Sequence, residues 1–184
     1  ANYHALNNEG RGMCLFYSII MARNPNLSQE KLHTNALEMR KDVAEHIRNN
    51  RKAFSRSIRY RLQHDEQAHF GIDPRNRSKP IPCPDAKTKP NDDYFEEYCN
   101  WIALENSWGS DVEIQALADV SKRRLLFLTQ AEGPIAYGGD FYPNTIEHGT
   151  TTPTLVMMTY GTQADSWGYH FEAMVPHSLD LNDF

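Results

Sequence analysis

Cys14 and His170 are the two residues of the chain whose chemistry best suits covalent catalysis. Cys14 follows a loop with two glycines, residues 9–13, and opens an apolar run that continues to Met21. This order predicts a thiol at the start of a buried helix, where the macrodipole and unpaired backbone N–H groups stabilise a thiolate. The same N–H groups could form an oxyanion hole for an acyl intermediate. Taken alone, however, a single cysteine is more often a small buried hydrophobe.

His170 belongs to a segment with the composition of a β-strand, and Glu172 follows it by two positions. Alternate residues of a strand point to the same face, so the imidazole and the carboxylate are expected to be neighbours. A carboxylate in that position can hold the ring's tautomer and stabilise its protonated form, which is the third role in a catalytic triad. By itself the pair is more simply a strand histidine beside a surface glutamate, so the inference depends on Cys14.

The elements that must position these residues begin with helices. Apolar residues recur at steps of three and four from Ser28, which predicts a helix and, after Asn49-Asn50, a second one. The apolar positions are Leu32, Ala36, Met39, Val43 and Ile47, followed by Phe54, Ile58 and Leu62. A long loop is expected over residues 71–92, because its prolines break regular structure.

Two further helices are predicted before the strands begin. In residues 94–102, one helical face carries Tyr94, Tyr98 and Trp101 or Ile102. Ser110 and Glu113 form the S-x-x-E capping box of the next helix, in which each side chain satisfies a free N–H of the first turn. Strands are then expected over residues 124–129, 154–160 and 168–175. Helices followed by strands predict an α+β domain.

Three blocks of the sequence resemble the ovarian-tumour (OTU) family of deubiquitinating cysteine proteases. Residues 12–19, GMCLFYSI, are similar to the family's Cys loop and helix, usually written D-G-x-C-L-F. Residues 108–118, WGSDVEIQALA, resemble its W-G-G-x-x-E-L-x-A-L-A helix, and residues 169–174, YHFEAM, resemble its terminal H-Y-x-x-hydrophobic strand. Each block is degenerate by itself, but the three occur in the family's order and bracket residues 10–175.

The resemblance implies a papain-like OTU fold, with a central β-sheet flanked by helices and an extended helical lobe, in a single catalytic domain over residues 1–184. Residues 24–93 would be a helical insertion with a proline-rich loop, similar to the arm that helps some bacterial effector relatives bind ubiquitin. The implied reaction is hydrolysis of isopeptide bonds at the C-terminus of ubiquitin or a ubiquitin-like protein. In it Cys14 is the nucleophile, His170 the general base and Glu172 the residue that orients the ring.

Two positions depart from the family's pattern. Family members often carry Asp three residues before the nucleophile, where this chain has Arg11, which cannot orient an imidazolium. Glu9 is the nearby acid that could substitute for it. Other members place an acid or amide two residues after the histidine, and Glu172 stands there with a side chain longer than the usual Asp or Asn.

The expected substrate contacts follow from the same resemblance. Backbone N–H groups of Arg11, Gly12 and Cys14 are expected to hold the oxyanion of the acyl intermediate. Trp167 and Tyr169 are candidates for the walls of a narrow channel around the two glycines that end the ubiquitin tail. Packing within the sheet explains these two aromatic residues equally well.

Composition narrows the class of protein. The chain has 184 residues, a net charge of −5 and a pI near 5.9, which argue against nucleic acid as a partner. No apolar run reaches the roughly 18 residues of a membrane span. Three cysteines, an odd number without paired metal-ligand spacing, favour a reducing compartment and no metal or other cofactor. We therefore expect a cytoplasmic protein, acting in the host cytoplasm if it is a secreted effector.

Two alternatives remain open from the sequence. With Arg11 in place of the acid, the chain could be a catalytically weak or inactive module that keeps the fold and binds ubiquitin. It could also be an interaction domain, because four basic residues share one stripe of a predicted helix and could contact an acidic partner. The residues of this basic stripe are Arg48, Lys52, Arg56 and Arg59. A solvated helix face is the simpler explanation, and no aromatic residues interleave for single-stranded nucleic acid.

Overall fold

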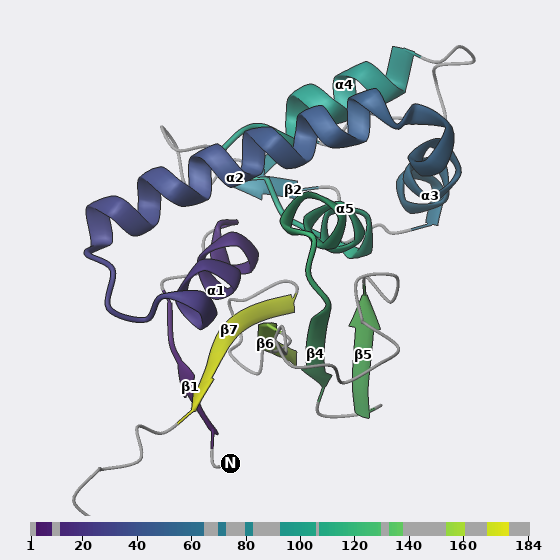
Figure 1. Cartoon of the computed structure of the whole chain (residues 1–184). Coiled ribbons are helices and arrows are strands. Elements are labelled where there is room, and N and C mark those ends of the chain that lie inside the picture. The colour runs from purple at the N-terminus through teal and green to yellow at the C-terminus, as the bar shows by residue number, and fades with distance from the viewer. Residues whose placement is uncertain are drawn as a thin grey trace, which may run out of the picture.

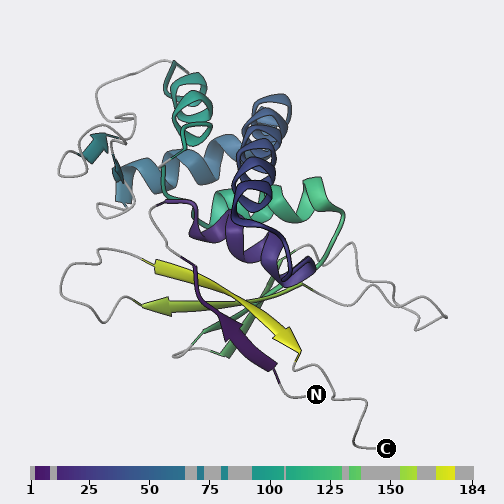
Figure 2. The ribbon, with the colours of Figure 1, turned by 90° about the vertical axis from the view of Figure 1, so that its left-hand side faces the viewer.

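The structure is a computed structural model that describes residues 3–8, 12–64, 70–72, 80–82, 93–105, 107–129, 133–137, 154–160 and 169–176. In these ranges the helices lie over one face of a five-stranded sheet (Figures 1 and 2), which is the predicted α+β class. The helices are α1 (Cys14–Arg23), α2 (Gln29–Asn49), α3 (Arg51–His64), α4 (Asp93–Ile102) and α5 (Asp111–Ser121). The strands are β1 (Tyr3–Leu6), β2 (Phe70–Ile72), β3 (Pro80–Pro82), β4 (Leu125–Thr129), β5 (Gly133–Tyr137), β6 (Thr154–Tyr160) and β7 (Tyr169–Pro176).

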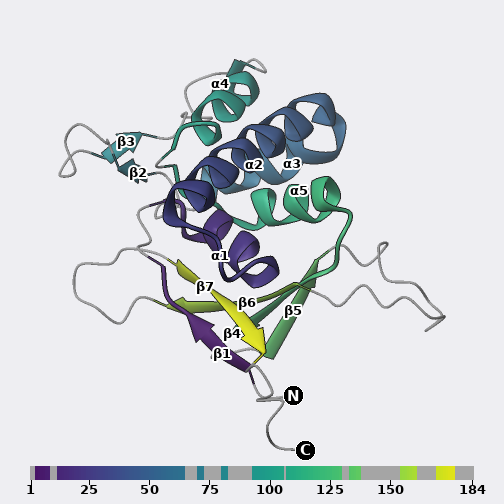
Figure 3. The same ribbon diagram turned by 60° about the vertical axis from the view of Figure 1, so that its left-hand side comes forward.

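The five-stranded sheet has the order β1-β7-β6-β4-β5, and its one parallel pair is β4 with β6. β7 lies between β1 and β6, so the first and last described strands are neighbours (Figure 3). Leu6 pairs with Ala173 in β7, and Thr159 of β6 pairs with His170. The sequence predicted β4, β6 and β7 but neither edge strand, because four or five residues are too few for an alternating pattern.

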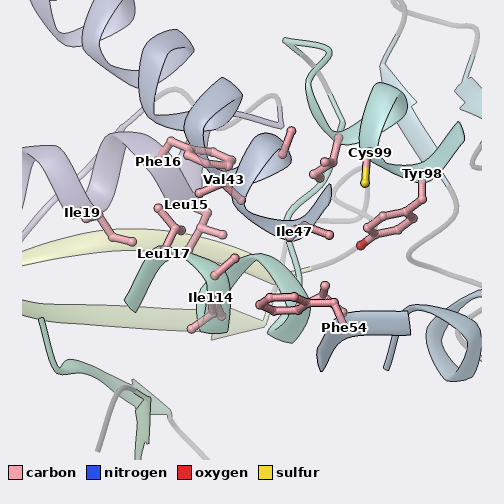
Figure 4. Packing of buried hydrophobic residues seen from close by; sticks show 14 of the residues in the cluster. Leu15, Phe16, Ile19, Val43, Ile47, Phe54, Tyr98, Cys99, Ile114 and Leu117 are labelled. Atoms are coloured by element: carbon pink, nitrogen blue, oxygen red, sulfur yellow. The ribbon is translucent and has the colours of Figure 1, made fainter. Parts of the chain in front are cut away.

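α1 is buried on nearly all sides because it lies between the sheet and the other helices (Figure 3). It packs on β7 and β6 below and on α2 above. Leu15, Phe16 and Ile19 belong to the core, close to Val43 and Leu117 of the neighbouring helices (Figure 4). Burying an apolar side chain of this size stabilises the fold by about 1.5–3 kcal/mol. The helix that begins with Cys14 is therefore held firmly on the sheet.

α2 and α3 follow the predicted pattern closely. Ser28 caps α2 by accepting a hydrogen bond from the Lys31 N–H at 3.4 Å, and the chain breaks between the helices at Asn50. The buried apolar residues of the two helices are Leu32, Ala36, Val43, Ala44, Ile47, Phe54, Ile58 and Leu62. One position differs from the expectation, because Met39 is only partly buried and Arg40 is fully buried.

The segment expected to be a loop over residues 71–92 contains short strands at its start. β2 pairs with β3 in antiparallel fashion, with Gly71 opposite Ile81. Pro80 and Pro82 lie in β3, although proline cannot donate to a ladder. Alternate residues of a strand direct their backbone groups to the same edge, so both prolines can face the unpaired edge of this two-stranded ribbon.

The turn before α5 is held by the predicted capping box. Ser110 Oγ accepts from the Val112 N–H at 3.3 Å, and Glu113 accepts from the Ser110 N–H at 2.7 Å. This turn also contacts α1, because a Cβ on Gly109 would stand 2.5 Å from Leu15 Cδ2. Glycine at this position therefore allows α5 to approach the residue that follows Cys14.

Gly109→Ala is expected to lower the free energy of unfolding by about 1–3 kcal/mol, the usual cost of overpacking a core. The reason is that Leu15 is fully buried and has little room to move away from the new methyl group. Urea denaturation measures the change. The control is the same substitution in a Leu15→Ala background, where the methyl has room and should cost less. Equal costs in both backgrounds would contradict the contact.

Candidate active site

Cys14 is the first residue of α1, at the predicted position. The chain turns into the helix at Gly12, whose φ of 84° lies in the left-handed region that glycine enters without steric cost. The first hydrogen bond of the helix runs from the Tyr17 N–H to the Met13 carbonyl at 2.9 Å. The N–H groups of the preceding residues have no acceptor within the helix, as at any helix N-terminus. They are therefore suited to an anion beside Cys14.

A chain of side-chain hydrogen bonds, here called the Asn8 seam, joins the first turn of α1 to β7. Ser18 Oγ donates to the Cys14 carbonyl at 2.7 Å. Asn8 Nδ2 donates to Ser18 Oγ at 3.0 Å and to the Phe171 carbonyl at 2.8 Å. Phe171 stands between His170 and Glu172, so the seam fixes the backbone that carries the histidine against the helix that carries the cysteine. The sequence analysis missed Asn8 and Ser18.

The thiol of Cys14 lies beside the same strand. Burial raises its pKa, while backbone hydrogen bonds at Phe171 and Leu15 and the charge of Arg40 lower it, with burial the largest effect. The sequence predicted a stabilised thiolate from the helix start alone. The structure differs because the residue is only 9% exposed, so desolvation of the thiolate outweighs the favourable groups. Burial therefore favours the protonated thiol over the thiolate at Cys14.

His170 and Glu172 are neighbours on the face of β7 opposite to buried Phe171. His170 Nε2 and Glu172 Oε1 are 3.9 Å apart, and the two side chains are 28% and 18% exposed. That separation allows an ion pair but is longer than a hydrogen bond. Glu172 can therefore attract an imidazolium at Nε2, and a small shift of its side chain would complete a hydrogen bond.

Several predicted site residues lie outside the described residues. Glu9 and Arg11 precede the first described residue of the Cys loop, and Trp167 precedes β7. Tyr169 opens β7, but its side chain also lies outside the description. Their proposed roles as orienter, oxyanion donor and channel walls stay predictions. Cys83, which the sequence does not assign to the site, is likewise outside the described ranges.

Two buried arginines lie in the helical layer above the sheet, and the sequence did not predict their burial. Arg40 of α2 donates to the Gly12 carbonyl at 2.5 Å. Arg61 of α3 donates to Glu113 at 2.8 Å and to the Trp108 carbonyl at 3.0 Å. The first therefore holds the Cys loop, and the second holds the turn that contacts Leu15.

Two of the four residues of the basic stripe bind other side chains of the molecule. Arg48 contacts Glu45 at 2.6 Å and Glu96 at 3.1 Å, so two carboxylates compensate its charge. Arg59 donates to the Tyr94 hydroxyl at 3.3 Å. Lys52 and Arg56 are exposed. Binding of an acidic partner to this stripe stays a prediction.

No three histidine, cysteine, aspartate or glutamate side chains of the described residues cluster as metal ligands would. Across the same residues, no helix combines the length and the apolar character needed to cross a bilayer.

A thiol at the start of a buried helix, next to a strand that carries a histidine and a carboxylate, has the composition of a cysteine peptidase site. The comparison with known families agrees with this class. The model of the OTU-like cysteine proteases matches residues 9–171, so the chain belongs to that family. No curated protein sequence matches the chain at a significant level.

Solved structures share the fold at low sequence identity. An OTU deubiquitinase from Wolbachia pipientis wMel has a TM-score of 0.53 and 19% identity, covering 94% of this chain and 88% of that one. The viral OTU domain protease from Dera Ghazi Khan virus has a TM-score of 0.52 and 15% identity, with 94% and 80% covered. An OTU domain in complex with ubiquitin has a TM-score of 0.50 and 14% identity, with 94% and 69% covered. The chain therefore has the predicted OTU fold.

Proposed function

We propose that the protein is a deubiquitinase that hydrolyses isopeptide bonds at the C-terminus of ubiquitin or polyubiquitin. The observation that carries the proposal is the Asn8 seam, which ties the Cys14 helix to the strand segment between His170 and Glu172. Membership of the OTU-like cysteine proteases supports the reaction. The solved OTU domain in complex with ubiquitin supports the substrate.

The proposed reaction starts from a protonated thiol. His170 takes the proton from Cys14, and the thiolate attacks the carbonyl of the last residue of ubiquitin to form a thioester. The imidazolium then protonates the departing lysine amine, and the neutral ring activates water to hydrolyse the thioester. Glu172, on the Nε2 side of the ring, stabilises the imidazolium in both halves of the reaction.

Backbone groups of the Cys loop complete the proposed site. The N–H groups of Gly12 and Cys14, with that of Arg11, would donate to the oxyanion that forms in each half of the reaction. Trp167 and Tyr169 would confine the ubiquitin tail, in which two glycines allow passage through a narrow channel. No cofactor takes part in these steps.

The wider organisation is part of the same proposal. We propose one catalytic domain over residues 1–184, with residues 24–93 as the helical insertion that contributes to ubiquitin binding. A deubiquitinase meets its substrates in the cytoplasm of a eukaryotic cell. The proposed location is therefore the cytoplasm, and the host cytoplasm if the protein is a secreted effector.

A ubiquitin probe with a C-terminal electrophile is expected to form a covalent adduct with the wild-type protein and none with Cys14→Ala, because the adduct requires the sulfur. Intact-protein mass spectrometry measures the capture. Cys99→Ala is the matched control, since it removes the other buried thiol of the described residues and should be captured like the wild type. Lack of capture by the wild type, or capture by Cys14→Ala, would refute the assignment.

The same experiment separates the alternatives. An inactive module would bind ubiquitin in calorimetry without forming the adduct. A domain that uses the basic stripe would bind neither probe nor ubiquitin and would bind a polyanion with steep salt dependence. Once capture is established, linkage-defined ubiquitin dimers and ubiquitin-like probes would identify the preferred substrate.

A further inference from the structure

Arg40 is a buried cation placed directly behind the Cys loop. It lies in α2, which packs against α1, α4 and α5 (Figure 3), and its side chain is fully buried. Its guanidinium carbon is 4.3 Å from the centre of the Phe16 ring, in cation–π distance. A buried arginine requires strong compensation, because removing its charge from water is costly. The groups that accept hydrogen bonds from Arg40 therefore indicate its role.

The two terminal nitrogens of Arg40 bind three segments of the chain. Nη2 donates to the Gly12 carbonyl at 2.5 Å and to the Ser107 carbonyl at 2.9 Å. Nη1 donates to the Ile102 carbonyl at 2.9 Å and to the Ser107 hydroxyl. All four acceptors are neutral oxygens, and within the described ranges no carboxylate pairs with Arg40. Among the described residues, carboxylates such as Glu113 and Glu105 therefore act on the Arg40 charge only from beyond hydrogen-bond distance.

Arg61 shows the usual alternative in the same protein. It is also buried, but it pairs directly with the Glu113 carboxylate at 2.8 Å. The charges of that pair compensate each other, whereas Arg40 keeps its charge next to the loop that presents the nucleophile. Arg61 is thus the matched control for Arg40.

The hydrogen bond to Gly12 also fixes the direction of a peptide group. The described chain has no cis peptide bonds, and in a trans peptide the N–H points opposite to the carbonyl. With the Gly12 carbonyl on the guanidinium, the Met13 N–H points away from Arg40. Rotation of this peptide would break the bond to Arg40 and move the backbone that carries the proposed oxyanion donors.

We propose that Arg40 is a positioning residue of the Cys loop, which clamps the Gly12–Met13 peptide from inside and supplies an interior positive charge behind the loop that leads into Cys14. The proposal rests on Cys14 being the nucleophile. Substitutions can separate the two parts of this proposal, the clamp on the peptide and the positive charge. The clamp needs the forked guanidinium, whereas the charge needs only a cation.

The charged groups around the site agree with this role. The charge of Arg40 lowers the pKa of the Cys14 thiol, against burial, which raises it. Burial in turn lowers the pKa of Arg40 to about 10, and Glu113, Cys14, Glu105 and Tyr17 raise it, so the guanidinium stays protonated at neutral pH. From β7, His170 and Glu172 flank Phe171, whose backbone hydrogen-bonds at Cys14, and both are left unchanged in the test.

The test measures how fast iodoacetamide alkylates Cys14 at each pH, quantified on the Cys14 peptide by mass spectrometry, together with kcat and KM for a ubiquitin substrate. For Arg40→Gln we expect the alkylation midpoint to move to higher pH and the rate at pH 7 to fall about tenfold, with rates converging at high pH. For Arg40→Lys we expect a midpoint near that of the wild type. We expect kcat to fall in both variants with little change in KM.

The control substitutions are Arg61→Gln and Arg61→Lys, which disturb a buried arginine without touching the Cys loop. They should lower thermal stability and leave the alkylation midpoint in place. A wild-type midpoint in folded Arg40→Gln, or an equal shift in the Arg61 variants, would overturn the proposal. The alkylation readout needs no ubiquitin, so failure of the deubiquitinase proposal and failure of this one can be told apart.

A milder variant keeps the proposal testable if neither Arg40 variant folds. Ser107→Ala removes one acceptor of the guanidinium and leaves Arg40 in place. We expect this protein to keep its near-UV circular dichroism and to lose at least about twofold in kcat, because the guanidinium is held less firmly. An unchanged kcat in folded Ser107→Ala would overturn the clamp.

Discussion

Cys14→Ala, His170→Ala and the double variant are expected to show the same residual activity, at least about 10³-fold below the wild type in kcat. Burial raises the pKa of Cys14, so in the proposed reaction the thiol depends on His170 to take its proton, and the two residues are expected to act as a unit. Loss of either partner stops the same proton transfer, and loss of the second removes nothing further. Hydrolysis of a fluorogenic amide of the ubiquitin C-terminus measures the rates.

His46→Ala is a matched control for His170→Ala. His46 is a half-buried histidine that also faces a carboxylate, with its Nε2 3.2 Å from Asp119 Oδ2. It lies on α2, and we expect His46→Ala to keep the wild-type kcat. A double variant much slower than either single variant would contradict a shared step, since independent contributions multiply.

We expect Glu172 to contribute less to kcat than Cys14 and His170. Its 3.9 Å separation from His170 gives electrostatic attraction without a hydrogen bond, so Glu172→Gln removes a charge but breaks no close contact. We expect a loss of kcat smaller than that of His170→Ala. Wild-type rates in Glu172→Gln would remove it from the triad and turn attention to Glu9 or to an uncharged orienter.

Local patterns were sufficient to predict the framework of the site. The position of Cys14 at a helix start came from glycines followed by an apolar run, and the start of α5 came from the Ser110 capping box. β7 came from its strand composition. In each case the physical cause lies within a few residues, where sequence is informative.

The residues that hold the framework together were not predictable in this way. Asn8 bonds to a carbonyl 163 positions away, and Arg40 bonds to carbonyls 28 and 67 positions away. A charged residue is expected to be exposed when its partners are unknown. The sequence therefore assigned Met39 to the buried face of α2, where Arg40 is the fully buried residue. The raised pKa of Cys14 has the same origin, because burial depends on elements distant in sequence.

Arg61→Met is expected to give the largest loss of stability, about 3–5 kcal/mol in the free energy of unfolding by urea denaturation. Arg61 is 6% exposed and its partner Glu113 is 0% exposed. Tyr98 donates to Glu113 at 2.6 Å, so part of the hydrogen bonding would survive. The carboxylate charge, however, would be left in the interior without the cation that bonds to it directly.

Arg59→Met is the control for this substitution, because Arg59 is exposed and donates to the Tyr94 hydroxyl at the edge of the same helical layer. Its cost should stay within about 1 kcal/mol. Arg61→Met combined with Glu113→Gln should cost less than the sum of the two single substitutions, since no unpaired charge remains. Additive costs would contradict a direct charge pair.

Arg61→Met also tests how the proposed helical insertion is joined to the proposed catalytic residues. Arg61 of α3 reaches Glu113 and the Trp108 carbonyl at the start of α5, and Gly109 of that turn lies against Leu15, next to Cys14. The destabilisation should therefore spread through one contiguous core (Figure 4). We expect Arg61→Met to unfold in a single transition, in which far-UV circular dichroism and Cys14 alkylation change together. Two separate transitions would mean instead that α2 and α3 form a unit that can unfold while the Cys14 site stays intact.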